Sequence, residues 1–321
     1  MAPVTERSVM LERDAQLEEK NLFQKLKDTC QAASFLAPFL IMIILFFAVP
    51  VILTAVLAFS GMDFKLQWNF VGLDNFIRIL KDPVIPQVAA NTLVYVVFTC
   101  IINVGFGFLL AVMTAYFIKN ESVGLFFRTL WLLPRMTPSV VYALLWIWFL
   151  EPTENGMLNI IFKSLFDMQP HNWIQDNPMK VIIFANGMIG ASFGMIVFSA
   201  AIKSIPEDYF RAAMVDGAND FQIIKNIIIP FLKWPIMFAT IWQTLSLLTS
   251  YEYILLLTDG GPLFDSEVLS LFAYHKAFAN FEFGYGAASA MVLVIIGALI
   301  TLLMLKLFGY ERMMNPSKLG N

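Results

Sequence analysis

Long stretches without any charged residue constrain this chain more than any other feature. A bilayer core about 30 Å thick needs roughly 20 apolar residues per helix, so such stretches are long enough to span a membrane. The stretches that contain no Asp, Glu, Lys or Arg are 29–62, 84–118, 181–202 and 283–305. Two more apolar stretches, 126–150 and 234–258, carry a few charges. None shows the alternation of apolar and polar residues that is typical of a membrane β-barrel.

The pattern predicts an all-α, polytopic membrane protein with six transmembrane helices. The predicted spans are residues 34–60, 88–117, 126–150, 181–202, 234–258 and 283–305. The composition agrees, since 59% of the residues are apolar and only 14% are charged, against roughly 45–50% and 25% in soluble domains. Two cysteines and two histidines exclude a disulfide framework and leave little material for a metal site. A net charge of −3 gives no electrostatic footprint for nucleic acid.

The distribution of basic residues predicts the orientation. With six spans, the side that holds both termini carries 14 Lys and Arg residues, and the other side carries six. The positive-inside rule therefore places both termini in the cytoplasm. We expect a cytoplasmic N-terminal tail at 1–33, a transmembrane domain at 34–310 and a cytoplasmic C-terminal tail at 311–321. The external segment 63–86 has the spacing of a short amphipathic helix.

The cytoplasmic segment 203–235 is the most informative part of the chain. Ser204 and Glu207 have the spacing of a capping box, as do Asn219 and Gln222, so a helix is expected to begin at each place. Gly217 lies between them and can turn the chain, because glycine accepts positive φ. The segment is thus predicted to form a helix–turn–helix with a tip of small residues. It is either a docking element for another protein or an ordinary connection between two spans.

The same segment resembles a known motif. Ala212-Ala213-x-x-Asp216-Gly217-Ala218, preceded by Pro206 and followed by Ile229-Pro230 and Pro235, is similar to the EAA loop of ABC importer permeases. Further similar positions are Phe126-Phe127-Arg128, Pro134, Pro138, Trp146, the turn at 156–159 and Thr258-Asp259-Gly260-Gly261-Pro262. Together they resemble the MalF-like, binding-protein-dependent carbohydrate permeases, over residues 34–310.

The resemblance implies a type I importer fold with the EAA loop as a cytoplasmic coupling loop to an ATPase. The residues expected to contact the ATPase are Glu207, Arg211, Ala212, Ala213, Asp216, Gly217, Ala218 and Pro230. Arg211 departs from the family, which usually has Glu there. The chain has no Gly-Lys dipeptide and hence no phosphate-binding Gly-x-x-x-x-Gly-Lys loop. ATP and Mg are therefore expected on a separate ATPase subunit, and this chain binds no cofactor and has no catalytic residue.

Polar residues within the fourth and fifth spans are the candidates for a substrate path, because such residues usually face the interior of a helix bundle. With the glycine and aromatic residues beside them, the candidates are Asn186, Gly190, Ser192, Phe193, Gln243, Ser246, Thr249, Ser250 and Tyr251. Gln243, Ser246 and Ser250 share one stripe, and amides, hydroxyls and aromatic rings suit a hydroxyl-rich ligand. The alternative is that these Ser and Thr side chains only bond backbone carbonyls or hold helices together.

Arg135 and Glu252 are charges placed within spans. An intramembrane charge normally has a partner, so the two are expected to pair with each other or with a second permease subunit. The resemblance favours a gate or a helix-positioning role for them.

The predicted function is the membrane subunit of an ATP-driven importer of a carbohydrate-type solute. The implied partners are a second homologous permease, an ATPase dimer, an extracytoplasmic solute-binding protein and the lipid of the inner membrane. An ion-gradient-driven secondary transporter is the alternative, although only one carboxylate lies within a span and no repeat is evident. A membrane enzyme would need clustered catalytic residues, which the sequence does not contain.

Overall fold

A computed structural model of the chain describes residues 34–308, so the predicted tails at 1–33 and 311–321 lie outside the described residues. This part of the chain is helical, with one isolated bridge between Ser60 and Phe70 and no strand. The predicted all-α fold class is confirmed. The structure divides into two compact units after Val56, which are described separately.

The first unit contributes residues 34–56, most of one long helix. Ser34–Ala58 is helical, with one π-helical turn, η1 (Ile44–Ala48), followed by α2 (Val49–Ala58). Its mean hydropathy is 3.0, and no residue of its most apolar window is buried within the chain. A helix that exposes apolar side chains all round matches a lipid environment, as the first predicted span requires.

Three other helices are long and apolar enough to cross a membrane unbroken. They are α4 (Ile85–Val112), which continues through the π-helical η2 (Met113–Phe117), α9 (Pro178–Lys203) and α16 (Phe283–Phe308). They correspond to the predicted spans at 88–117, 181–202 and 283–305. Proline occupies the first turn of α4 and of α9, where its missing N–H costs no hydrogen bond.

The predicted third span is not one helix. It consists of α5 (Glu121–Met136) and α6 (Ser139–Phe149), whose axes differ by 96°. Pro138 causes the break, because its ring disfavours helical backbone at Thr137, which is extended with φ −76° and ψ 134°. The expectation of a continuous helix over 126–150 was therefore wrong, although the two helices still pass as one span together.

The predicted fifth span is also broken. Helix α13 (Lys233–Leu248) ends before Glu252, where the short α14 (Glu252–Leu257) begins. At its other end α13 follows α11 (Asp220–Ile223), the π-helical η3 (Ile224–Ile228) and α12 (Ile229–Phe231), with a bend of 67°. Counting each bent pair once, the described chain has up to six spans.

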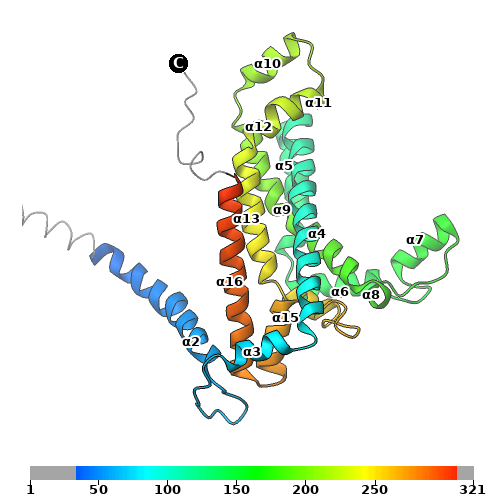
Figure 1. Ribbon diagram of the computed structural model, residues 1–321. Helices are drawn as coiled ribbons and strands as arrows, with labels where there is room; N and C mark the ends of the chain where they lie inside the picture. Colours follow the sequence, from blue (N-terminus) through cyan, green and yellow to red (C-terminus); the bar gives the residue numbers. More distant parts are fainter. Residues whose placement is uncertain (1–33, 309–321) are drawn as a thin grey trace, which may run out of the picture. The chain divides into compact units, whose positions relative to one another are not determined.

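The second unit is built on close contact between α4 and α9. A Cβ atom at Gly107 of α4 would lie 2.7 Å from the carbonyl oxygen of Ala191, and one at Gly190 of α9 would lie 2.4 Å from the side chain of Asn103. Small residues at such crossings let two backbones approach, as in other membrane helix pairs. Helix α13 packs against both α4 and α9, so the three run side by side (Figure 1).

Short helices lie at the two ends of this bundle. In Figure 1, α10 (Glu207–Val215), α11 and α12 lie at one end, called the α10 end below. The opposite α3 end holds α3 (Asp74–Lys81), α8 (Trp173–Asp176) and α15 (Leu269–Tyr274) with the π-helical η4 (His275–Ala279), while α7 (Met157–Phe166) projects to the side of the bundle.

The amphipathic helix expected within 63–86 is α3. Its buried Asn75 donates hydrogen bonds to the carbonyl oxygens of Ala58 and Ser60 at 2.9 and 2.8 Å, and Arg78 pairs with Glu282 at 2.9 Å. Helix α3 also packs against α16 and α4.

Candidate functional site

The α10 end of the bundle carries the predicted helix–turn–helix, with one change at its start. Helix α9 continues to Lys203, and Ser204 forms its C-cap, donating a side-chain hydrogen bond to the carbonyl oxygen of Ala201 at 2.8 Å. The hydroxyl is thus turned back toward α9 and caps no new helix. The capping box expected at Ser204 was wrong, and α10 begins at Glu207, after Pro206 in extended backbone.

The turn itself forms as the sequence predicts. Gly217 has φ +78°, and its N–H and that of Ala218 donate to the carbonyl oxygens of Met214 and Ala213 at 3.1 and 2.9 Å. This closes α10 with a left-handed residue, which glycine adopts without a steric cost. Asn219 and Gln222 then form a complete capping box at the start of α11.

Most of the predicted coupling residues are exposed on this element. Glu207, Arg211, Ala212, Asp216, Gly217 and Pro230 are exposed, while Ala213 and Ala218 are partly buried. Arg211 forms an ion pair with Glu207, one turn earlier on α10. The side chains of Met214, Val215 and Phe221 expose 59, 88 and 72% of their surface. Exposed apolar side chains beside a tip of small residues are typical of a protein-binding surface.

Two contacts that the sequence analysis missed fix this element to the bundle. Tyr116, at the end of the α4–η2 helix, donates a hydrogen bond to Asp220 at 2.8 Å, and its ring packs on Phe210 of α10 at 5.8 Å between ring centres. Glu121, at the start of α5, pairs with both Arg128 and Lys203. Tyr116 therefore ties the helix–turn–helix to the α4–η2 helix, while Glu121 ties α5 to the end of α9, directly before the element.

A cavity of about 300 Å³ lies between α5, α9 and α13. Gly190, one of its lining residues, is near the middle of α9, so the cavity is at mid-height of the bundle. Six of the nine predicted path residues line it together: Asn186, Gly190, Phe193, Gln243, Ser246 and Ser250. Arg135, Ile189, Trp242, Leu247 and Tyr253 complete the lining.

Hydrogen bonds hold the amides of this cavity in place. Asn186 donates to the hydroxyl of Tyr95 at 2.6 Å, and that hydroxyl donates to Ser250 at 3.2 Å. Gln243 donates to the carbonyl oxygen of Gly190 at 3.1 Å, and its Oε1 lies 3.2 Å from the side-chain amide of Asn103. The network links α4, α9 and α13, so the polar lining is positioned in advance.

Aromatic rings form one wall of the cavity. The ring of Phe193 stacks on that of Trp242 at 6.2 Å and an interplanar angle of 22°. The ring of Phe238 lies 6.4 Å from both of them. Trp242 was not among the predicted residues, although it directly precedes Gln243. Tyr95 and Asn103 were missed as supports because they belong to α4, outside the two spans that were considered.

Three predicted path residues are not in this cavity. Ser192 is buried and donates to the carbonyl oxygen of Ile189 at 2.7 Å. Thr249 bonds the carbonyl oxygens of Leu245 and Ser246 and lines a separate groove of about 750 Å³ against α16. The ring of Tyr251 stacks on that of Tyr274 at 4.9 Å. The hydroxyls of Ser192 and Thr249 therefore bond backbone carbonyls, which was the alternative to a role in the substrate path.

Arg135 and Glu252 do not pair with each other. Within residues 34–308 no carboxylate lies within 4.0 Å of the Arg135 guanidinium. Glu252 instead accepts a hydrogen bond from Ser139, the first residue of α6. The 96° break between α5 and α6 separates Arg135 and Ser139, so the acid engages α6 while the base faces the cavity.

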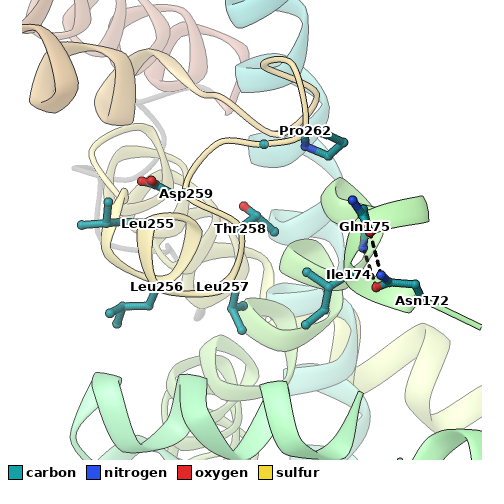
Figure 2. A pocket seen from close by; sticks show the side chains of 10 residues that line it. Asn172, Ile174, Gln175, Leu255, Leu256, Leu257, Thr258, Asp259 and Pro262 are labelled. Carbon is teal, nitrogen blue, oxygen red and sulfur yellow. Dashed lines mark hydrogen bonds between the residues drawn. The ribbon is translucent and has the colours of Figure 1, made fainter. Parts of the chain in front are cut away.

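The α3 end holds a second pocket, of about 490 Å³. Figure 2 shows Asn172, Ile174 and Gln175 on one side and residues 255–259 with Pro262 on the other. The turn at 258–262 is held by hydrogen bonds among Thr258, Ser266 and Gly261. No predicted path residue lines this pocket, so it is distinct from the mid-height cavity.

Comparison with known proteins decides the family. Residues 103–310 match the binding-protein-dependent transport system inner membrane component family. The chain belongs to this family. As an inner membrane component of a transport system, this multi-pass permease is a transport subunit rather than an enzyme.

Individual relatives agree with this assignment. An ABC transporter permease protein of Pyrococcus horikoshii is 31% identical over 84% of this permease and 92% of its own length. The arabinooligosaccharides transport system permease protein AraP of Bacillus subtilis is 27% identical over 86% of this permease and 87% of its own length.

A solved structure supports the fold. The crystal structure of a bacterial ABC transporter involved in the import of the acidic polysaccharide alginate contains a chain with a TM-score of 0.79. The alignment covers 92% of this permease and all of that chain at 23% identity. The predicted type I importer fold is thereby confirmed. Family membership also removes the alternative of an ion-gradient-driven secondary transporter.

Proposed function

We propose that this permease is one of two membrane subunits of an ATP-driven importer of a carbohydrate-type solute: a sugar, glycoside, polyol or sugar-phosphate-like compound. It forms the translocation path with a second, homologous permease. A dimer of ATPase subunits binds ATP and Mg and drives the cycle, and this chain binds no cofactor. An extracytoplasmic solute-binding protein delivers the solute.

The mid-height cavity carries this proposal. Amide and hydroxyl groups of Asn186, Gln243, Ser246 and Ser250 meet there beside the ring of Trp242. Polyhydroxylated ligands need directional hydrogen-bond partners together with an aromatic face, and this lining offers both. The relatives supply independent support, since AraP is described as transporting arabinooligosaccharides.

The exposed helix–turn–helix supports coupling to an ATPase. Its apolar side chains Met214, Val215 and Phe221 are exposed in the part of the chain that the structure describes, and a partner with a matching groove would bury them. Tyr116 joins this element to the α4–η2 helix, and Glu121 of α5 pairs with Lys203 at the end of α9, directly before the element. A force applied at the tip would thus reach helices that also pack around the cavity.

The proposed orientation places the α10 end and both termini in the cytoplasm, and the α3 end outside, where the binding protein docks. A cysteine at exposed Asp216 tests it, with Cys30 and Cys100 replaced by serine. A membrane-impermeant thiol reagent should label it in inverted vesicles and not in intact spheroplasts. Labelling only in spheroplasts would reverse the orientation.

Reconstitution tests the function. Proteoliposomes would contain this permease, its second permease and the ATPase, with the binding protein outside and ATP inside, and uptake of radiolabelled sugars and polyols would be measured. We expect uptake to require both ATP and the binding protein. Uptake that continues without ATP under a proton gradient would reject the proposal, and so would failure to take up any carbohydrate-type solute.

A further inference from the structure

The cavity contains a full positive charge that has no carboxylate partner within residues 34–308. Arg135 lines it together with Asn186, Ser250 and Tyr253. No carboxylate of the described chain lies within ion-pair distance of its guanidinium. Arg128, the other basic residue of α5, pairs with Glu121.

The carboxylate that was expected to pair with Arg135 bonds another group. Glu252 accepts a hydrogen bond from Ser139 and does not line the cavity. Arg135 lies in the last turn of α5, whose C-terminus supplies only about half a negative charge. An uncompensated cation at mid-membrane depth is costly, so an anion that reaches the cavity would stabilise the guanidinium.

The surrounding groups define which anion would fit. The guanidinium presents several N–H donors in a planar fork that matches the two oxygens of a carboxylate or phosphate. On the facing helices, Asn186, Gln243 and Ser246 supply amide and hydroxyl groups. A solute that carries one oxyanion on a polyhydroxylated frame satisfies the cation and these neutral groups at once.

We propose that Arg135 is a specificity-determining residue that selects an anionic, polyhydroxylated solute bearing a carboxylate or phosphate, with its oxyanion on the Arg135 guanidinium and its hydroxyls on Asn186, Gln243 and Ser246. The proposal rests on the proposed carbohydrate import function. The alternative partner for Arg135 is an acidic side chain of the second permease. The test below distinguishes the two.

The experiment uses the complete transporter in proteoliposomes with three matched probe pairs: glucose and glucuronate, cellobiose and cellobiouronate, and glycerol and glycerol 3-phosphate. Uptake is compared for the unaltered permease, Arg135→Gln and Arg135→Lys. Binding of each probe to the solute-binding protein is measured separately, because that protein is the same in all three transporters. Any difference between variants therefore belongs to the permease.

We expect the anionic member of at least one pair to be transported preferentially. Arg135→Gln should lower its uptake about 10- to 100-fold, the loss typical of a hydrogen-bonded charge, and leave the neutral member unchanged. Arg135→Lys should retain part of the preference, because it keeps the charge and loses the fork geometry. Lys306→Gln, which removes an exposed charge in the last turn of α16, is the control and should change nothing.

Three results would overturn the proposal. A neutral member transported as well as its anionic counterpart leaves carbohydrate import intact and refutes the selection. Equal loss of both members in Arg135→Gln, with loss of the second permease on purification, assigns Arg135 to the subunit interface instead. Uptake of no probe in any pair rejects the proposed function together with the inference.

Discussion

Asn186 of α9 donates a 2.6 Å hydrogen bond to the hydroxyl of Tyr95 on α4, and Tyr95 is fully buried. The same hydroxyl donates to Ser250, in the unwound segment between α13 and α14. One phenol thus joins three parts of the bundle and fixes the amide that faces the cavity. The polar lining depends on a residue that is not itself part of it.

Tyr95→Phe should therefore lower both stability and transport. The substitution keeps the ring but leaves Asn186 and Ser250 without this partner. Interhelical hydrogen bonds in membranes contribute about 0.6 and up to about 1.7 kcal/mol, which sets the expected loss in the free energy of unfolding. Thermal unfolding of the solubilised permease measures the loss, and Tyr209→Phe on exposed α10 is the control. Equal stability of the two variants would contradict the assigned role.

Gly107→Ala should destabilise the permease, whereas Gly105→Ala on the same helix should not. A Cβ atom at Gly107 meets the backbone of α9 at 2.7 Å, but one at Gly105 meets nothing within 4 Å. Forcing an extra carbon into a packed contact costs about 1–3 kcal/mol. Parallel thermal unfolding of both variants measures the difference. A Gly105→Ala variant as damaged as Gly107→Ala would argue against the α4–α9 packing described above.

Substitutions at Gly217 should separate backbone shape from side-chain contact. A Cβ atom there has open space, but φ is +78°, and left-handed backbone costs a non-glycine residue about 1–2 kcal/mol. Gly217→Val should distort the turn and reduce co-purification of the ATPase, while Gly217→Asn, which tolerates this conformation, should retain it. Full co-purification of the Val variant would exclude this turn from docking.

Arg211 should matter for association with the ATPase and hardly at all for folding. Arg211 and Glu207 expose 68 and 77% of their side chains, and exposed pairs at this spacing contribute about 0.3–0.5 kcal/mol. Arg211→Glu should leave the unfolding temperature almost unchanged and weaken ATPase binding, most strongly at low ionic strength. If the charge reversal leaves ATPase binding unchanged, the charge at position 211 does not contribute to docking in this transporter.

Glu267 should make stability dependent on pH. Its side chain is 2% exposed, and burial raises its pKa above the usual 4.5, although the neighbouring His275 opposes the shift. The folded state then binds the proton more tightly than the unfolded state. The contribution to stability is present below about pH 4.5 and is lost as the pH rises through the raised pKa.

Unfolding temperatures of the wild type and Glu267→Gln between about pH 4 and 7 test this linkage. The wild type should lose stability relative to Glu267→Gln as the pH rises. The charged groups around Glu267 are Asp259, His275 and Lys276, so His275→Gln is the second variant and should enlarge the dependence. Parallel curves for wild type and Glu267→Gln would disprove the shift.

The features that depend on local sequence pattern, the spans and the turn at Gly217, could be predicted from the sequence. Uncharged length placed the spans, and Gly217 with the Asn219 capping box placed the turn. The stripe Gln243, Ser246 and Ser250 does face one cavity, because the polar groups of a mostly apolar helix turn away from lipid.

Interactions between distant segments could not be predicted in this way. The hydroxyl of Ser204 could cap a new helix or close the old one, and the continuation of α9 decides between them. Tyr95 and Trp242 look like ordinary apolar packing until α4, α9 and α13 are placed together. Pro138 was visible in the sequence, but hydropathy does not distinguish a straight span from one with a 96° bend.

The bend at Leu232 has a mechanical consequence. Helix α13 leaves the helix–turn–helix at that point, and the cavity residue Ser246 lies 13 residues after Lys233 on the same helix, which is about 20 Å at 1.5 Å per residue. Tilting a rod of that length by about 5° displaces its far end by about 2 Å. A small rotation at Leu232 would thus move Ser246 far enough to make or break a hydrogen bond. Helix α13 can therefore act as a lever arm.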